Sequence, residues 1–284
     1  MFVRWCLLLL PSCIGFHLVA GRPKCARREG MAHLSATSHD TSSFTIETCS
    51  GEQEGIGMLA AFMVDAFWIG SSRQLTKECD ISSISEPVRE RMVAEQAHDL
   101  TEKYGERMGK RLCDSLLMVA KDDDSGALLG MVGLEVTLFD KGLGNILSAE
   151  KAESILKNAV ASLGPKQRRQ YKDASAQQIA TELLSPDVSS ICCLSNLAVS
   201  PLARRRGVAL SLCSELESVV KQIEYDRIVL KVEKDNEEAR ALYENKLGYV
   251  TECEVAGETA LRANPEAGTF EETTVDSVIL SKDL

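Results

Sequence analysis

The feature that most constrains the fold is an apolar strand, a basic turn and an amphipathic helix, which follow one another from Ile191 to Ile223. Residues 191–199 are apolar on both faces, as is typical of a strand at the centre of a sheet. Arg204-Arg-Arg-Gly207 forms a short turn, and apolar residues at helical spacing predict a helix from about Val208. This unit predicts a mixed α/β domain with a central sheet.

The basic turn has the composition of an anion-binding site. A helix N-terminus presents free backbone N–H groups and the positive end of the helix dipole. Gly207 allows the backbone to approach a ligand closely, Ala209 keeps the first helical turn slim, and Arg204, Arg205 and Arg206 supply positive charge. In a chain of net charge −10, this pattern indicates a pyrophosphate ligand. The alternative is a basic surface loop that caps a helix, since neither GxxxxGK[ST] nor GxGxxG is present.

Hydrophobic periodicity and turn residues predict the other elements. We expect strands at 44–49, 115–120, 127–139, 226–232, 249–256 and 274–281, and helices at 56–67, 86–112, 148–163, 174–184 and 235–246, the last with a capping box of Asp235 and Glu238. Loops are expected at 79–85 and between the last two strands. Residues 140–189 are polar and are expected to form an insertion, whose basic patch Lys166-Gln-Arg-Arg169 is either a solvated face or part of a substrate groove.

The first forty residues differ in charge from the rest of the chain. Their net charge is +3, whereas the other 244 residues carry −13. Arg4 precedes the apolar run Trp5–Ile14, which is too short for a transmembrane helix, and a basic, hydroxylated stretch follows. We therefore expect a targeting presequence at 1–42 and a folded domain at 43–284. The pattern resembles the two-part plastid presequences of algae with complex plastids; a secretory signal or a mitochondrial presequence is the alternative.

Charge and ligand residues limit the partners. An acidic chain argues against nucleic-acid binding, and no later segment is apolar enough to cross a membrane. The ten cysteines include no CxxC pair, and His98 is the one histidine beyond residue 40, so we expect free thiols and no metal. The adjacent Cys192 and Cys193 should point to opposite faces of their strand.

The motifs resemble those of the GNAT (GCN5-related) N-acetyltransferase superfamily. Arg204-Arg-Arg-Gly-Val-Ala209 matches its phosphate-binding pattern [QR]-x-x-G-x-[GA]. Leu197-Ala-Val199 precedes this motif, and Asn236-Glu-Glu-Ala-Arg-Ala-Leu-Tyr243, with Leu-Gly248-Tyr249 after it, is similar to the family's fourth-helix signature. The order of elements extends the resemblance over Ser43–Leu284. The stretch Cys193–Val199 behind a long insertion is most similar to plastid acetyltransferases that modify protein lysines and N-termini.

The resemblance implies a fold with splayed central strands and acetyl-CoA as co-substrate. Leu197, Ala198 and Val199 would pair with the pantetheine arm, and the Val199 N–H would polarise the thioester carbonyl. Tyr243 would protonate the departing thiolate; its alternative is a core aromatic residue. The residues implied to contact the cofactor elsewhere are Arg204, Arg205, Arg206, Gly207, Val208, Ala209, Leu210, Asn236, Glu237, Glu238 and Tyr243.

The acceptor and its general base stay open. An acidic chain fits a protein amine, N-terminal or lysine, as acceptor, and it equally fits a polyamine or another small amine. Some relatives carry a glutamate at the position of Lys231, which leaves Glu233 and Glu135 as candidate bases, acting directly or through water. The alternative is that both are ordinary charges at strand edges. A covalent route through Cys192 or Cys193 lacks a neighbouring histidine. A module that senses acyl-CoA without turnover is the alternative to an enzyme.

Overall fold

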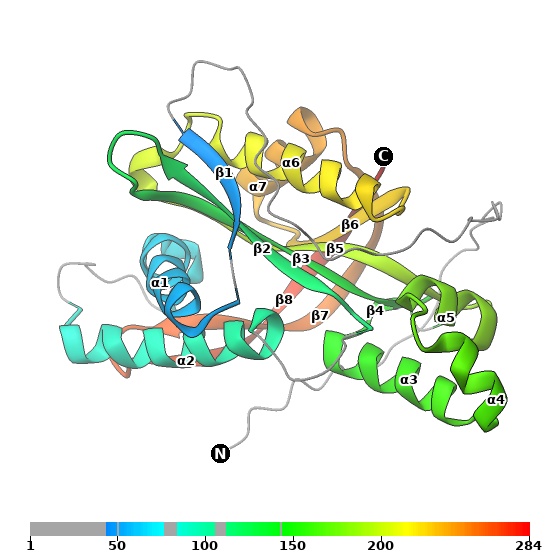
Figure 1. Cartoon of the computed structure of the whole chain (residues 1–284). Coiled ribbons are helices and arrows are strands. Elements are labelled where there is room, and N and C mark those ends of the chain that lie inside the picture. The colour runs from blue at the N-terminus through cyan, green and yellow to red at the C-terminus, as the bar shows by residue number, and fades with distance from the viewer. Residues whose placement is uncertain (1–43, 50, 77–83, 106–111, 143) are drawn as a thin grey trace.

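The computed structural model describes residues 44–49, 51–76, 84–105, 112–142 and 144–284 (Figure 1). The expected presequence at 1–42 and part of the expected loop at 79–85 lie outside these residues and stay predictions. The described domain is organised around a mixed, mostly antiparallel 8-stranded sheet in the order β1-β2-β3-β5-β6-β8-β7, with β4 beside β3. The strands are β1 (Phe44–Cys49), β2 (Ser115–Asp122), β3 (Leu128–Asp140), β4 (Asn145–Ile146), β5 (Val188–Val199), β6 (Arg227–Glu233), β7 (Val250–Asn264) and β8 (Thr269–Asp283).

Helices cover both faces of the sheet, and each face has its own core. On one face lie α1 (Gln53–Met63), its continuation η1 (Val64–Ile69), the short η2 (Ser72–Gln74) and α2 (Glu86–Tyr104). Their apolar side chains, such as Leu59 and Leu100, pack with Met131 of β3. On the other face α6 (Val208–Gln222) packs Leu212 and Leu216 against β3, β5 and β6. The short α7 (Glu237–Arg240) and η6 (Ala241–Lys246) follow β6.

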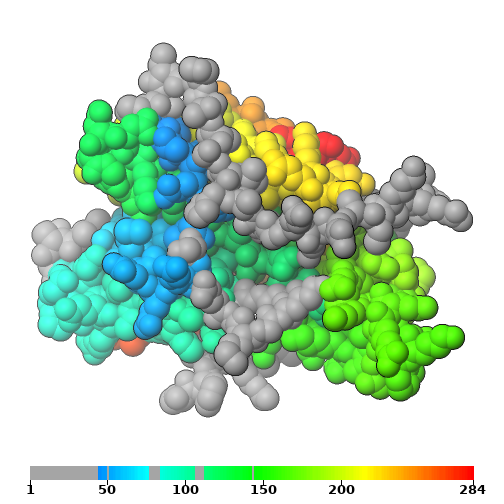
Figure 2. All heavy atoms as spheres, in the orientation of Figure 1, coloured from blue at the N-terminus to red at the C-terminus, as the bar shows by residue number. Residues whose placement is uncertain are grey.

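The polar insertion forms a lobe whose buried side chains, such as Leu156 and Ile179, join the same core as α6. It contains α3 (Ala149–Ala161), α4 (Pro165–Arg168), η4 (Arg169–Tyr171) and α5 (Ala176–Leu183), and it lies apart from α1 and α2 (Figure 2). The two helices predicted here are confirmed, whereas β4, α4 and η4 are too short for periodicity to detect. The basic patch at 166–169 is exposed on this lobe.

Two predicted boundaries are wrong. The helix predicted for 86–112 ends at Tyr104, because Gly105 adopts an extended conformation. The polar loop predicted between the last two strands is instead a continuation of the β7–β8 hairpin, whose turn spans residues 265–268. This outer part of the hairpin is partly exposed on both faces, so no apolar alternation marks it in the sequence.

The described residues include six cysteines, all free thiols: Cys49, Cys113, Cys192, Cys193, Cys213 and Cys253. Cys192 is fully buried and Cys193 half-buried, as expected for opposite faces of β5. In the described part of the chain, no three His, Cys, Asp or Glu side chains are grouped to hold a metal ion. None of the helices described there has the length and apolar character needed to span a bilayer.

Candidate active site

The two central strands separate in the middle of the sheet. β5 and β6 are parallel neighbours over three residue pairs, from Cys192–Ile228 to Leu194–Leu230. Beyond these pairs β5 continues along β3 to Val199, and β6 continues along β8 to Glu233. The backbone groups of Leu197 and Val199 on the β6 side therefore have no ladder partner in β6. The splayed central strands confirm the expected fold class.

A β-bulge marks the point where β5 leaves β6. Between the pairs Met131–Ala198 and Gly133–Ser195, the two residues Asn196 and Leu197 lie opposite Val132 alone. Asn196 takes the left-handed conformation, with φ 51°. An extra residue in one strand bends that strand and increases its twist. Because the bulge starts two residues after the last β5–β6 pair, it accounts for the separation.

A buried tyrosine holds the bulge from the α2 side. The Tyr104 hydroxyl donates to Glu135 Oε1 at 2.8 Å, accepts from Asn196 Nδ2 at 2.8 Å, and lies 2.7 Å from Ser195 Oγ. Burial, then the nearby Glu135 charge, raise the pKa of Tyr104 well above its ordinary value. Gly133 leaves room for this hydroxyl, since a Cβ there would lie 2.3 Å from it. Sequence reasoning missed this cluster; a glycine inside an apolar strand was its one local signal.

The turn after β5 has the backbone of an anion site. Arg205 has φ 65° and Gly207 has φ 86°, so two of three successive residues are left-handed. Alternating conformations of this kind direct neighbouring N–H groups into one concavity. The first intrahelical bond of α6 runs from the Ser211 N–H to the Gly207 carbonyl, at 3.0 Å. The N–H groups of Val208, Ala209 and Leu210 precede that bond and are the unpaired donors of a helix start. The backbone of this turn therefore has the conformation of an anion-binding turn, and its binding of a pyrophosphate stays a prediction.

The three arginines of the turn differ in their contacts. Arg204 donates to the carbonyl oxygens of Ala66 and Gly70, at 3.3 and 3.2 Å, and so ties the turn to the end of η1. Arg206 lies 3.6 Å from the Asp122 carboxylate. Arg205 is exposed, and the described residues give its guanidinium no polar partner. Arg205 is therefore the side chain best placed to meet a phosphate, while Arg204 has a structural contact.

Tyr243 is buried beside the separated strands. It lies in η6 with a side chain that is 6% exposed, and its ring packs 5.8 Å from the Tyr249 ring. Burial raises the pKa of the Tyr243 hydroxyl, with smaller contributions from Cys213 and Cys193. A phenol in these surroundings keeps its proton at neutral pH.

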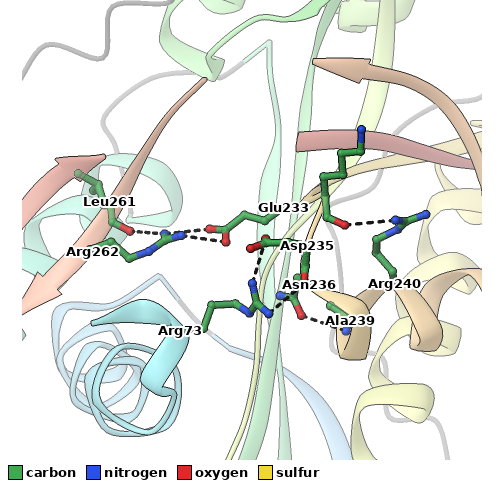
Figure 3. A network of polar contacts seen from close by, with 9 residues as sticks. Arg73, Glu233, Asp235, Asn236, Ala239, Arg240, Leu261 and Arg262 are labelled. Carbon is green, nitrogen blue, oxygen red and sulfur yellow. Dashed lines mark hydrogen bonds and ion pairs between the residues drawn. The ribbon is translucent and has the colours of Figure 1, made fainter. Parts of the chain in front are cut away.

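The start of α7 differs from the prediction. Asn236, rather than Asp235, is the N-cap, because its Oδ1 accepts from the Ala239 N–H at 3.2 Å. Asp235 instead forms an ion pair with Arg73 of η2, at 2.9 Å (Figure 3). Asn236 therefore has a structural contact at the place where a cofactor contact is expected. The side chains of Glu237 and Glu238 are exposed in the first turn.

Three ion pairs lie along the part of β6 that has separated from β5 and along the loop after it. Lys231 binds Glu258 of β7 at 2.8 Å, Glu233 binds Arg262 of β7 at 2.9 Å, and Asp235 binds Arg73. The arginines reach their carboxylates from different elements (Figure 3). Alternate residues of a strand share a face, so these pairs lie on one side of β6 and of the loop after it. Glu233, one of the two candidate bases, is thus held by an arginine.

A comparison with known protein families matches the segment that contains β5, the basic turn and Tyr243. Residues 177–249 match the acetyltransferase (GNAT) family. The match covers about a quarter of the chain and includes β5, the basic turn, α6, β6 and Tyr243. It supports an acyltransferase of the GNAT type, as the motifs of the sequence indicate. A comparison with curated proteins found no match.

Several solved structures are similar at low identity. Arabidopsis thaliana NAA60 in complex with acetyl-CoA is 13% identical, covers 85% of this chain and 98% of its own, and has a TM-score of 0.46. A GNAT-family acetyltransferase from Streptococcus pneumoniae is 13% identical, with coverages of 85% and 99% and a TM-score of 0.44. Ribosomal-protein-alanine N-acetyltransferase from Brucella melitensis is 14% identical, with coverages of 84% and 99% and a TM-score of 0.40. At these low scores, what those proteins bind or modify is not transferred to this chain.

Proposed function

We propose that this protein is an acetyl-CoA-dependent N-acetyltransferase whose acceptor is a protein amine, either an N-terminus or a lysine side chain. The observation that carries the proposal is the separation of β5 from β6 at the bulge, which ends in the left-handed turn at Arg205 and Gly207. An edge of free backbone groups suits the amides of a pantetheine arm. The turn and the start of α6 suit its pyrophosphate.

Acetyl-CoA supplies a thioester whose acetyl group can pass to an amine. In the proposed reaction the acceptor nitrogen bonds to the acetyl carbon, the carbon–sulfur bond breaks, and no covalent enzyme intermediate forms. The Val199 N–H stabilises the charge that develops on the acetyl oxygen. Tyr243 gives its proton to the departing thiolate, and a base takes the proton that the amine loses.

Glu135 is the base that the geometry favours. It lies on β3 opposite Cys193 and follows Gly133 by two residues, and the Gly133–Ser195 pair borders the bulge. The Tyr104 hydroxyl orients one of its oxygens, and the side chain is half-buried. Both oxygens of Glu233 are bound by Arg262, so this carboxylate is already engaged in an ion pair. A lysine acceptor needs such a base more than an N-terminal amine does, because its pKa is higher, about 10.4 against 7.7–8.0.

The charge of the chain supports a cationic acceptor. Its net charge is −10, and complementary charge steers basic partners to an acidic surface. A polyamine has the same sign of charge, so the test must compare the two classes. Purified protein is incubated with acetyl-CoA and either peptides with a free N-terminus and one lysine, or spermidine and free amino acids, and the products are identified by mass spectrometry.

We expect acetylated peptides. Acetylation confined to spermidine or free amino acids would replace the protein acceptor with a small amine. Tight acetyl-CoA binding without transfer to any amine would instead indicate an acyl-CoA sensor.

We also propose that residues 1–42 direct the chain to a plastid, on the basis of the Trp5–Ile14 apolar run and the basic stretch after it. Residues 1–45 fused to a fluorescent protein test this in cells with complex plastids. Plastid fluorescence is expected, and secretory or mitochondrial fluorescence would contradict it.

A further inference from the structure

A β-bulge in β7 changes the direction of the Glu258 side chain. The register of β7 against β8 shifts between Val255 and Glu258, and Gly257 takes the left-handed conformation with φ 68°. The Gly257 N–H donates to Asp276 Oδ1 at 3.0 Å, which fixes the bend. A bulge changes the direction of the side chains that follow it. As a result Glu258 reaches past β8 to β6, where it meets Lys231.

The Glu258 carboxylate is buried, and only one of its two oxygens has a hydrogen-bond partner among the described residues. Lys231 Nζ donates to Oε1 at 2.8 Å, while Oε2 is buried without a hydrogen-bond partner among the described residues. The Glu258 side chain is 10% exposed, whereas that of Lys231 is 39% exposed. An ionised carboxylate offers about four acceptor positions, and a buried oxygen without a partner is unfavourable. The carboxylate therefore has capacity for a second cationic donor.

This carboxylate lies beside the point where the central strands part. Lys231 is the first β6 residue after Leu230, which belongs to the last β5–β6 pair. Glu135 of β3 pairs with Cys193 of β5, and Cys193 pairs with Val229 of β6, two residues before Lys231. Because alternate residues of a strand share a face, Cys193, Lys231 and Glu135 lie on one side of the sheet, the side of the proposed acceptor. Glu258 supplies negative charge to that group from β7.

We propose that Glu258 binds the ammonium form of the acceptor amine before its proton is removed. The inference rests on the proposed function and adds the residue that receives the acceptor. The Lys231 ammonium already binds this carboxylate, and it has the same charge and the same kind of N–H donors as a substrate ammonium. Lys231 has a flexible, partly exposed side chain, and the proposed binding requires its ammonium to move enough to admit a second cation at the carboxylate.

The test measures acceptor binding separately from turnover. A peptide with a free N-terminus and one lysine is titrated by calorimetry into full-length protein saturated with coenzyme A. Glu258→Gln keeps the size of the side chain and removes its charge. We expect its peptide Kd to rise about 10- to 100-fold, the range for a lost hydrogen bond to a charged group. Its Kd for acetyl-CoA should equal that of the wild type.

Two variants separate binding from structural support. Glu254→Gln changes another β7 carboxylate, which pairs with Lys234 at 2.6 Å and is 60% exposed, and it should leave the peptide Kd unchanged. Lys231→Met breaks the same ion pair as Glu258→Gln but keeps the carboxylate, so peptide binding should stay equal or tighten. Equal weakening by Lys231→Met and Glu258→Gln would show that the pair acts only as structural support. An unchanged peptide Kd in Glu258→Gln would also overturn the proposal.

The two proposals fail in different ways. If the wild type acetylates no peptide, the protein-amine function fails irrespective of Glu258. If the wild type acetylates peptides and Glu258→Gln binds them as tightly, only the role of Glu258 fails. Melting temperatures of the three variants identify any loss of folding.

Discussion

The Arg262 guanidinium binds both oxygens of the Glu233 carboxylate, each at 2.9 Å. The two side chains are 13% and 16% exposed, so the pair is largely removed from water. Paired, fork-like contacts of this kind are among the stronger hydrogen bonds in proteins. Glu233 therefore serves the structure, by joining β6 to β7, and Glu135 is the base in the reaction that we propose.

The first prediction compares these two carboxylates. Glu135→Gln should lower kcat for peptide acetylation about 100-fold or more, the usual effect of losing a general base, with an unchanged KM for acetyl-CoA. Glu233→Gln should retain most of its kcat but melt at a lower temperature, because Arg262 loses its charged partner. Steady-state kinetics and thermal unfolding measure both effects. A larger loss of kcat in Glu233→Gln would reverse the assignment.

The second prediction concerns the proton donor. Tyr243→Phe should lower kcat about 100-fold or more and leave the Kd for acetyl-CoA unchanged. Tyr249→Phe is the matched control, since its ring packs against Tyr243 and its hydroxyl is also buried. Burial raises the pKa of Tyr243, so its hydroxyl stays protonated in alkaline solution. Its titration should therefore cause no fall in kcat below about pH 9. Equal kcat in the two phenylalanine variants would exclude Tyr243 as donor.

The third prediction excludes a covalent route through Cys193. Burial, then the Glu135 charge, raise the pKa of its thiol to about 12. At pH 8 only about one thiol in 10,000 is then ionised, and the thiolate is the nucleophile. Cys193→Ala should retain most of the activity, and intact-protein mass spectrometry should find no acetyl group on the wild-type enzyme after mixing with acetyl-CoA. An acetylated Cys193 would show a two-step mechanism instead.

The strand, turn and helix at the cofactor side could be predicted because their signals are local. Apolar runs and helical spacing define β5 and α6, and Gly207 marks the left-handed turn between them. The contacts of Arg204 could not be predicted in the same way. Its partners Ala66 and Gly70 lie more than a hundred residues away in the chain, and only the packing of η1 places them beside the turn.

The acceptor side depends on sheet register, which periodicity does not reveal. The Tyr104 cluster joins α2 to two strands, and its contacts with Ser195 and Asn196 exist because a bulge shifts β5 by one residue. Likewise Glu258 meets Lys231 because of the bulge at Gly257. Asp235 forms its ion pair with Arg73 instead of capping α7 for the same kind of long-range reason.

The fourth prediction concerns Gly133, which leaves room for the Tyr104 hydroxyl. In Gly133→Ala the new Cβ would lie 2.3 Å from the Tyr104 hydroxyl and 2.8 Å from Ser195 Oγ, so the tyrosine or the bulge must move. We expect a loss of about 1–3 kcal/mol in the free energy of unfolding, as for other overpacked sites, together with a lower kcat. Adding Tyr104→Phe removes the closest atom and should restore part of the stability. No recovery in the double variant would show that Tyr104 is not what Gly133 accommodates.

The fifth prediction concerns the carboxylate that joins the insertion to the start of β2. Glu153 of α3 accepts from the backbone N–H groups of Leu112 and Cys113, the latter at 2.7 Å, and its side chain is 18% exposed. Burial acts to raise its pKa, but these hydrogen bonds and Lys157 outweigh burial and lower it from 4.5. A lowered folded-state pKa contributes stability that is fully present above the ordinary value and is lost as the pH falls through the folded-state value.

Glu153→Gln should therefore cost about 1–3 kcal/mol of unfolding free energy at pH 7. The difference from the wild type should narrow as the pH falls below the ordinary pKa of a glutamate and the wild-type carboxylate takes up its proton. Urea unfolding at several pH values measures it, with Glu150→Gln, an exposed carboxylate of the same helix, as control. A difference that stays constant with pH would mean that Glu153 supports the insertion by shape rather than by charge.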